Sequence, residues 1–145
     1  MKPWEQNLAK LRNTPVAVSR HNMPESVENV ADYDEYGATI FVKFSDGTVL
    51  RASYWRFIQN GGPRLSSFDH HQQYGLPAAI DAKEKLCNLL EGKLCHKVEF
   101  DQETADLILT FGETTKLQVF RFTAYEDWEI SFPDGTGEYS NYAVT

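Results

Sequence analysis

Residues 38–52, which read ATIFVKFSDGTVLRA, decide the fold that the sequence predicts. Apolar and polar side chains alternate on both sides of Ser45-Asp46-Gly47, and this spacing is typical of two strands joined by a turn. A two-residue turn would mix apolar and polar side chains on each face. A three-residue turn with Gly47 in the left-handed conformation instead gives one apolar face. Because the buried face sets the register, we expect the three-residue turn, which places Val42 opposite Leu50.

The same pattern returns at residues 105–119, which read ADLILTFGETTKLQV, at an offset of 67 residues and without a gap. A helix expected at 3–13 matches a second one expected at about 82–91, and Ser67-Phe68 matches Ser131-Phe132 at the end of each unit. Ordered agreement of this kind favours an internal duplication. The alternative is a chance likeness between alternating strands.

We therefore expect an α+β fold that consists of two pseudo-repeated helix–four-strand units with mostly antiparallel sheet. The halves cover about residues 3–68 and 82–132, residues 133–145 form a polar tail, and the chain 1–145 is a single domain. The second helix is expected to begin at Asp81, paired with Glu84 in a capping box, and to end at Gly92. Further strands are expected at 16–18, 94–100, 105–111, 116–122 and 128–132.

The composition excludes several classes of protein. Fourteen Lys and Arg against 21 Asp and Glu give a net charge of −7, which argues against nucleic acid or an anionic membrane as the partner. No apolar run approaches the roughly 18–20 residues that span a bilayer, and the first residues do not form a secretory signal. Two cysteines are too few for a disulfide framework, so we expect a cytoplasmic protein with two buried thiols.

The first half has a longer loop before its hairpin than the second half. This stretch, residues 21–37, contains five acidic residues and no Lys or Arg, and long loops in compact domains are either functional or disordered. One hypothesis is that it binds a basic protein partner; the other is that its charges only solvate a mobile loop. The candidate contact residues are Glu25, Glu28, Asp32, Tyr33, Asp34, Glu35 and Tyr36.

Asp69-His70-His71, with Tyr74, is the candidate for an alternative ligand site or active site. A carboxylate beside histidine is suited to acid–base chemistry. Adjacent side chains of an extended chain point to opposite faces, however, so both histidines cannot bind one metal ion. We expect no metal and no cofactor. His96 is expected on the apolar face of its strand, as a core histidine.

Four motifs carry a resemblance that covers most of the chain after Ala38. They are Phe44-Ser-Asp-Gly-Thr48, Leu65-Ser-Ser-Phe-Asp-His70, Tyr74-Gly-Leu-Pro77 and Tyr125-Glu-Asp-Trp128. This set resembles a family of small bacterial domains of unknown function, which is similar to the immunity proteins that accompany secreted toxins. The duplicated unit is also similar in architecture to the Whirly single-stranded-DNA-binding fold, although the acidic charge counts against that activity. The motifs are structural, so the resemblance implies no catalytic residue.

The leading hypothesis is a non-enzymatic, acidic protein-binding domain, with an immunity protein that neutralises a basic toxin as its most concrete form. The alternative is a small-ligand binder or enzyme with a site around Asp69-His70-His71. A third hypothesis is a homodimer that forms through an exposed aromatic sheet face.

Overall fold

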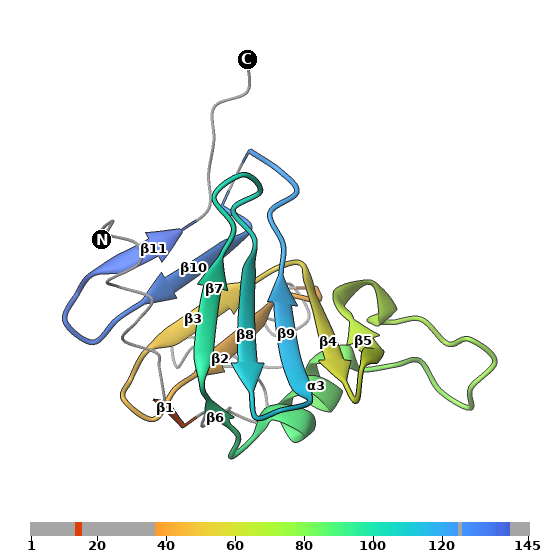
Figure 1. Ribbon diagram of the computed structural model, residues 1–145. Helices are drawn as coiled ribbons and strands as arrows, with labels where there is room; N and C mark the ends of the chain where they lie inside the picture. Colours follow the sequence, from red (N-terminus) through yellow and green to blue (C-terminus); the bar gives the residue numbers. More distant parts are fainter. Residues whose placement is uncertain (1–13, 16–36, 125, 140–145) are drawn as a thin grey trace.

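The computed structural model describes residues 14–15, 37–124 and 126–139, which are coloured in Figure 1. The helix expected at 3–13, the strand at 16–18, the acidic loop up to residue 36 and the tail residues 140–145 lie outside the described residues.

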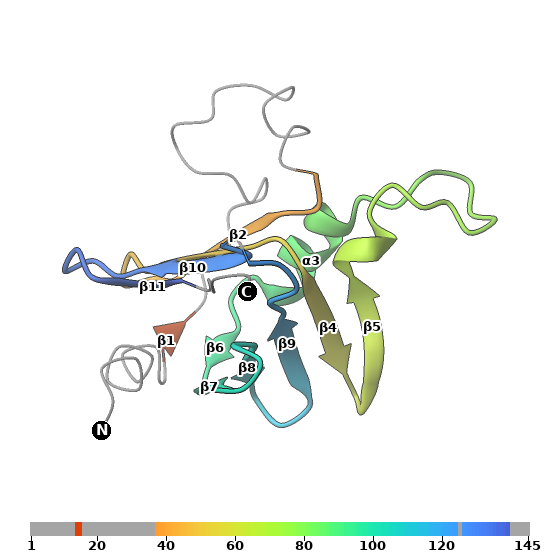
Figure 2. The same cartoon turned by 90° about the horizontal axis from the view of Figure 1, so that it is seen from above.

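Two antiparallel sheets make up most of the structure and form two layers whose strands run in different directions (Figures 1 and 2). The first has the order β11-β10-β3-β2 and contains β2 (Ile40–Lys43), β3 (Val49–Ala52), β10 (Trp128–Ser131) and β11 (Gly137–Tyr139). The second has the order β5-β4-β9-β8-β7 and contains β4 (Trp55–Gln59), β5 (Gly62–Ser66), β7 (Lys97–Phe100), β8 (Leu107–Phe111) and β9 (Thr115–Val119). A short pair joins β1 (Thr14–Pro15) to β6 (Leu94–Cys95).

The expected mostly antiparallel architecture is confirmed, and β-structure dominates it. Among the described residues there is one α-helix, α3 (Ala82–Leu90), and one 3₁₀ turn, η1 (Ser67–Asp69). No helix in the described part of the chain is both long and apolar enough to cross a membrane.

The β2–β3 hairpin has the register that the apolar face predicts. Val42 pairs with Leu50, and the Phe44 amide donates a hydrogen bond of 2.8 Å to the Thr48 carbonyl. Gly47 closes the turn with φ +95°, a conformation that side-chain-bearing residues rarely adopt. The β8–β9 hairpin has the equivalent register, in which Leu109 pairs with Leu117.

After each hairpin, the chain crosses to the other sheet. β4 follows β3 but pairs with β9, where Trp55 lies opposite Val119. β10 follows β9 but pairs with β3, where Trp128 lies opposite Ala52. The two indoles make similar hydrogen bonds: the Nε1 of Trp55 donates to the Ala38 carbonyl (2.9 Å), and that of Trp128 donates to the Ala105 carbonyl (2.8 Å). Each hairpin is thus extended by a strand that follows the other hairpin.

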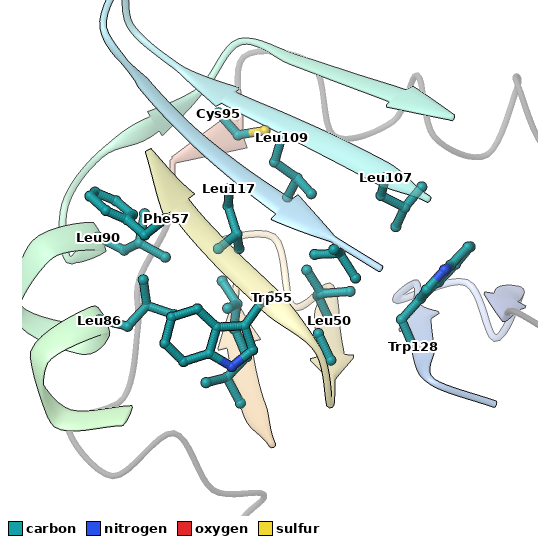
Figure 3. Close-up of a cluster of buried hydrophobic side chains, with 14 of the residues drawn as sticks. Leu50, Trp55, Phe57, Leu86, Leu90, Cys95, Leu107, Leu109, Leu117 and Trp128 are labelled. Atoms are coloured by element: carbon teal, nitrogen blue, oxygen red, sulfur yellow. The ribbon is translucent and has the colours of Figure 1, made fainter. Parts of the chain in front are cut away.

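The core lies between the sheets and is covered on one side by α3 (Figure 3). The Asp81 side chain accepts a hydrogen bond from the Glu84 amide at the start of this helix, as predicted, and Gly92 beyond its end has φ +79°. Leu86 and Leu90 point from α3 toward Trp55 and Phe57 of β4. Burying one such leucine completely stabilises the fold by roughly 1.5–3 kcal/mol.

The two segments expected to close the units differ in detail. Ser131 is the last residue of β10, whereas Ser67-Phe68 follows the end of β5, because the Asp69 side chain accepts the Ser66 amide and turns the chain into η1. The prediction that His96 lies in the core is wrong, because this residue is exposed. The expected strand at 94–100 is broken at His96, because β6 pairs with β1 whereas β7 pairs with β8. Cys95 is the residue that faces the interior at this break, and both cysteines are buried as expected.

Candidate functional site

The candidate acidic contact residues, Glu25, Glu28, Asp32, Tyr33, Asp34, Glu35 and Tyr36, all lie outside the described residues. The alternative candidates Asp69, His70, His71 and Tyr74 are described, and the structure brings them together. Asp69 ends η1, and the other three lie in the loop between η1 and α3, which extends away from the two sheets (Figures 1 and 2).

Hydrogen bonds from these side chains hold the loop against its neighbours. The Tyr74 hydroxyl donates to Asp69 Oδ1 (2.9 Å), and Asp69 Oδ2 accepts the Ser66 amide (2.8 Å). The hydrogen bond to Asp69 raises the pKa of the Tyr74 phenol above its ordinary value. His70 Nδ1 accepts the Ala82 amide at the first turn of α3 (3.0 Å), and its side chain is only 5% exposed. Each of these contacts supports the local backbone.

The expectation that the two histidines point to opposite faces is wrong. Their rings stack with centroids 3.9 Å apart, because His71 has φ +69° and the chain is not extended there. His70 Nδ1, which accepts the Ala82 amide, is not free to bind a metal ion in this geometry. Within the described ranges, no group of three or more His, Cys, Asp or Glu could hold a metal ion.

A cluster of four aromatic side chains, two of them exposed and two half-buried, lies where the chain passes between the two sheets, and no sequence motif predicts it. We call Tyr54, Phe68, Phe120 and Phe122 the aromatic patch. Tyr54 stacks on Phe68 with ring centroids 6.0 Å apart and meets Phe122 edge-on at 5.3 Å, and Phe122 stacks on Phe120 at 5.4 Å. Phe68 is 67% exposed and Phe122 is 57% exposed. The patch is therefore a contiguous apolar surface.

Arg56 extends this surface along the outer side of β4. Its guanidinium carbon lies 5.1 Å from the centre of the Phe120 ring, within the range of a cation–π interaction. Its Nη1 also donates a hydrogen bond of 3.0 Å to Gln118 Oε1 on β9. These two contacts fix the guanidinium at the edge of the aromatic patch.

A buried carboxylate positions Phe122. Asp127 is 5% exposed, and its Oδ2 accepts the Phe122 amide (2.6 Å) and the Thr123 amide (2.8 Å). Its Oδ1 accepts the Thr123 hydroxyl (2.7 Å). The backbone at Phe122 and Thr123 is thus held by a buried acceptor, while the Phe122 ring remains exposed.

A small acidic hollow adjoins the patch on the outer side of the second sheet. It has a volume of about 110 Å³ and shares Phe120 with the patch. The remaining lining residues are Glu99, Asp101, Asp106, Leu107, Ile108 and Gln118. We call this feature the acidic hollow.

Two features of the sequence point to parts of the patch. The alternating pattern predicts Phe120 and Phe122 within a strand over 116–122, but β9 ends at Val119, so both residues lie in the β9–β10 link and not in the sheet. In Trp55-Arg56-Phe57, the arginine between aromatic residues is visible in the sequence, but both aromatic side chains are buried and only Arg56 is exposed.

No family model, no curated protein and no solved structure matches this chain.

Proposed function

We propose that this chain is a non-enzymatic protein-binding domain and that its contact surface is the aromatic patch together with Arg56. The main observation that supports the proposal is the exposure of the Phe68 and Phe122 rings to solvent. Leaving such a ring in water forgoes roughly 1.5–3 kcal/mol of burial free energy. Aromatic and arginine side chains are enriched at protein interfaces, and tyrosine and arginine are common among the residues that contribute most of the binding energy there.

The partner that we propose has a basic surface around an apolar contact. The net charge of −7 attracts such a partner and raises the rate of encounter. An immunity protein that blocks a basic toxin is the most concrete form of this function. Five of the carboxylates behind this net charge lie in the acidic stretch 21–37 of the sequence and would contribute to the same attraction.

The alternative site around Asp69-His70-His71 receives less support. Asp69 and His70 each have a role in holding the loop that needs no ligand. We therefore do not extend the proposal to an enzymatic activity there.

We also infer that the two halves are diverged copies of one unit. The matched hairpin registers and the two indole hydrogen bonds support this inference. On this interpretation the β3–β4 link at 53–54 corresponds to the longer β9–β10 link at 120–127, which carries Phe122. The aromatic patch would then include a segment that only one copy has.

The test compares three forms of the intact chain as bait in a lysate of the source cell. The first is the wild type, the second carries Phe68→Ser and Phe122→Ser, and the third is the control Tyr139→Ser. Tyr139 is also exposed, at 53%, but lies on β11 in the other sheet. Thermal unfolding of each form checks that the fold is retained.

We expect a basic protein that the wild type and the control retain in a fixed ratio and release as salt is raised. Two interface residues worth more than about 1 kcal/mol each predict that the double variant binds at least roughly tenfold more weakly. A partner that the double variant retains equally well contradicts the proposal. Sedimentation of the purified chain tests self-association, and a dimer that the double variant abolishes would assign the patch to a second copy instead.

A further inference from the structure

The acidic hollow and the aromatic patch form one continuous surface. Phe120 belongs to both, and Gln118, which accepts the hydrogen bond from Arg56, also lines the hollow. A partner segment that covers the patch and continues across β9 therefore reaches the hollow next.

Two of the three carboxylates at the hollow are held in place by backbone amides. Asp101 Oδ1 accepts the amides of Glu103 (2.9 Å) and Thr104 (3.3 Å), and Asp106 Oδ1 accepts the amide of Arg121 (2.8 Å). These hydrogen bonds engage one oxygen of each carboxylate. Glu99 has an exposed neighbour, Lys97, whose ammonium lies 3.6 Å away, and pairs of this kind in water are weak.

Size and charge together select the group that fits. A volume of about 110 Å³ is several times the roughly 10–15 Å³ that a cavity needs to hold one water molecule, so the hollow can accept the end of a long side chain. Three carboxylates line the hollow, and of the nearby cations Lys97 pairs with Glu99 and Arg56 is engaged with Gln118 and Phe120. This excess of negative charge favours a cation over an anion. It also disfavours nucleic acid, whose phosphates would be repelled.

We propose that the segment bound at the aromatic patch carries a lysine or arginine beside its apolar side chains, and that this cation enters the acidic hollow. The inference rests on the proposed function, because the patch supplies the apolar contact that brings the segment to the hollow. Charge complementarity then sets the specificity, since a segment without the cation leaves the carboxylates desolvated and uncompensated.

Selection from a phage-displayed random peptide library tests this proposal with four forms of the intact chain. They are the wild type, the patch variant Phe68→Ser with Phe122→Ser, the hollow variant Glu99→Gln with Asp106→Asn, and the control Glu91→Gln with Glu113→Gln. The hollow variant and the control lose the same formal charge, and asparagine retains an oxygen that can accept the Arg121 amide. Asp101 is left unchanged because it holds the turn at 101–105.

We expect peptides selected on the wild type and on the control to combine aromatic or leucine residues with Lys or Arg. Peptides selected on the hollow variant should keep the apolar residues and lose the basic enrichment. For the best peptide, replacing its basic residue by norleucine should weaken binding about tenfold to the wild type and leave binding to the hollow variant unchanged.

Two results would overturn the proposal, and they differ in what else they overturn. Apolar peptides that depend on Phe68 and Phe122 but are not enriched in Lys or Arg refute the cation site and leave the proposed function standing. The same conclusion follows if peptides selected on the hollow variant are as rich in Lys or Arg as those selected on the wild type. A library that yields no peptide dependent on Phe68 and Phe122 contradicts the proposed function and this inference with it.

Discussion

Asp127 is the residue on which the exposed position of Phe122 depends most directly. Asp127→Ala leaves the Phe122 and Thr123 amides without their acceptor, so we expect a loss of about 1–3 kcal/mol in the free energy of unfolding. Urea denaturation measures the loss, and amide hydrogen exchange should rise first at residues 122 and 123. Asp127→Asn keeps one acceptor oxygen and should lose less. Equal stability of the alanine variant and the wild type would refute this role.

Cys95 should be an unreactive thiol. Burial raises its pKa to about 11, although an interaction with the Lys97 backbone lowers the pKa by a smaller amount. Because the folded state holds the proton more tightly, this contribution to stability is fully present below the ordinary thiol pKa. It is lost as the pH rises through about 11.

At pH 8 we expect iodoacetamide to modify Cys95 in the folded chain at least about a hundredfold more slowly than in urea, because few thiolates are present. Peptide mapping separates the signal of Cys95 from that of Cys87. Rapid modification of the Cys95 peptide in the native chain would show that this thiol is not buried as described.

The β2–β3 hairpin depends on the glycine in its turn. Gly47 has φ +95°, whereas a Cβ at this position would meet the Pro133 side chain no closer than 3.5 Å, an ordinary contact. Gly47→Ala should therefore destabilise the chain through backbone strain, by about 1–2 kcal/mol. Gly62→Ala is the matched control, because Gly62 lies at the end of another hairpin turn without a positive φ. A midpoint of unfolding that falls equally in both variants would contradict this explanation.

The elements that the sequence predicted correctly are those fixed by local patterns. Alternating side chains and Gly47 determine the hairpin register, and Asp81 determines where α3 begins. The pairing of β4 with β9 has no such local signal, because it joins residues about sixty positions apart. The aromatic patch combines Tyr54, Phe68 and the 120–122 segment, so it becomes visible only after that long-range pairing is known.

At the scale of the whole molecule, the crossed strands make the two sheets depend on one another. β4 leaves the first sheet to extend the second, and β10 makes the reverse exchange. Neither hairpin can keep its third strand if the other half of the chain unfolds. The expectation of a single domain over residues 1–145 is therefore a prediction about cooperativity.

We expect one thermal transition, in which the calorimetric enthalpy equals the van't Hoff enthalpy and the near-UV and far-UV signals change together. Trp55→Phe removes the hydrogen bond to the Ala38 carbonyl and should destabilise the chain by about 1–3 kcal/mol. If the sheets are coupled, this variant lowers the midpoint of the one transition without splitting it. The same holds for Trp128→Phe in the other half. Two separate transitions, or a variant that melts only one sheet, would mean that the exchanged strands do not join the sheets into one folding unit.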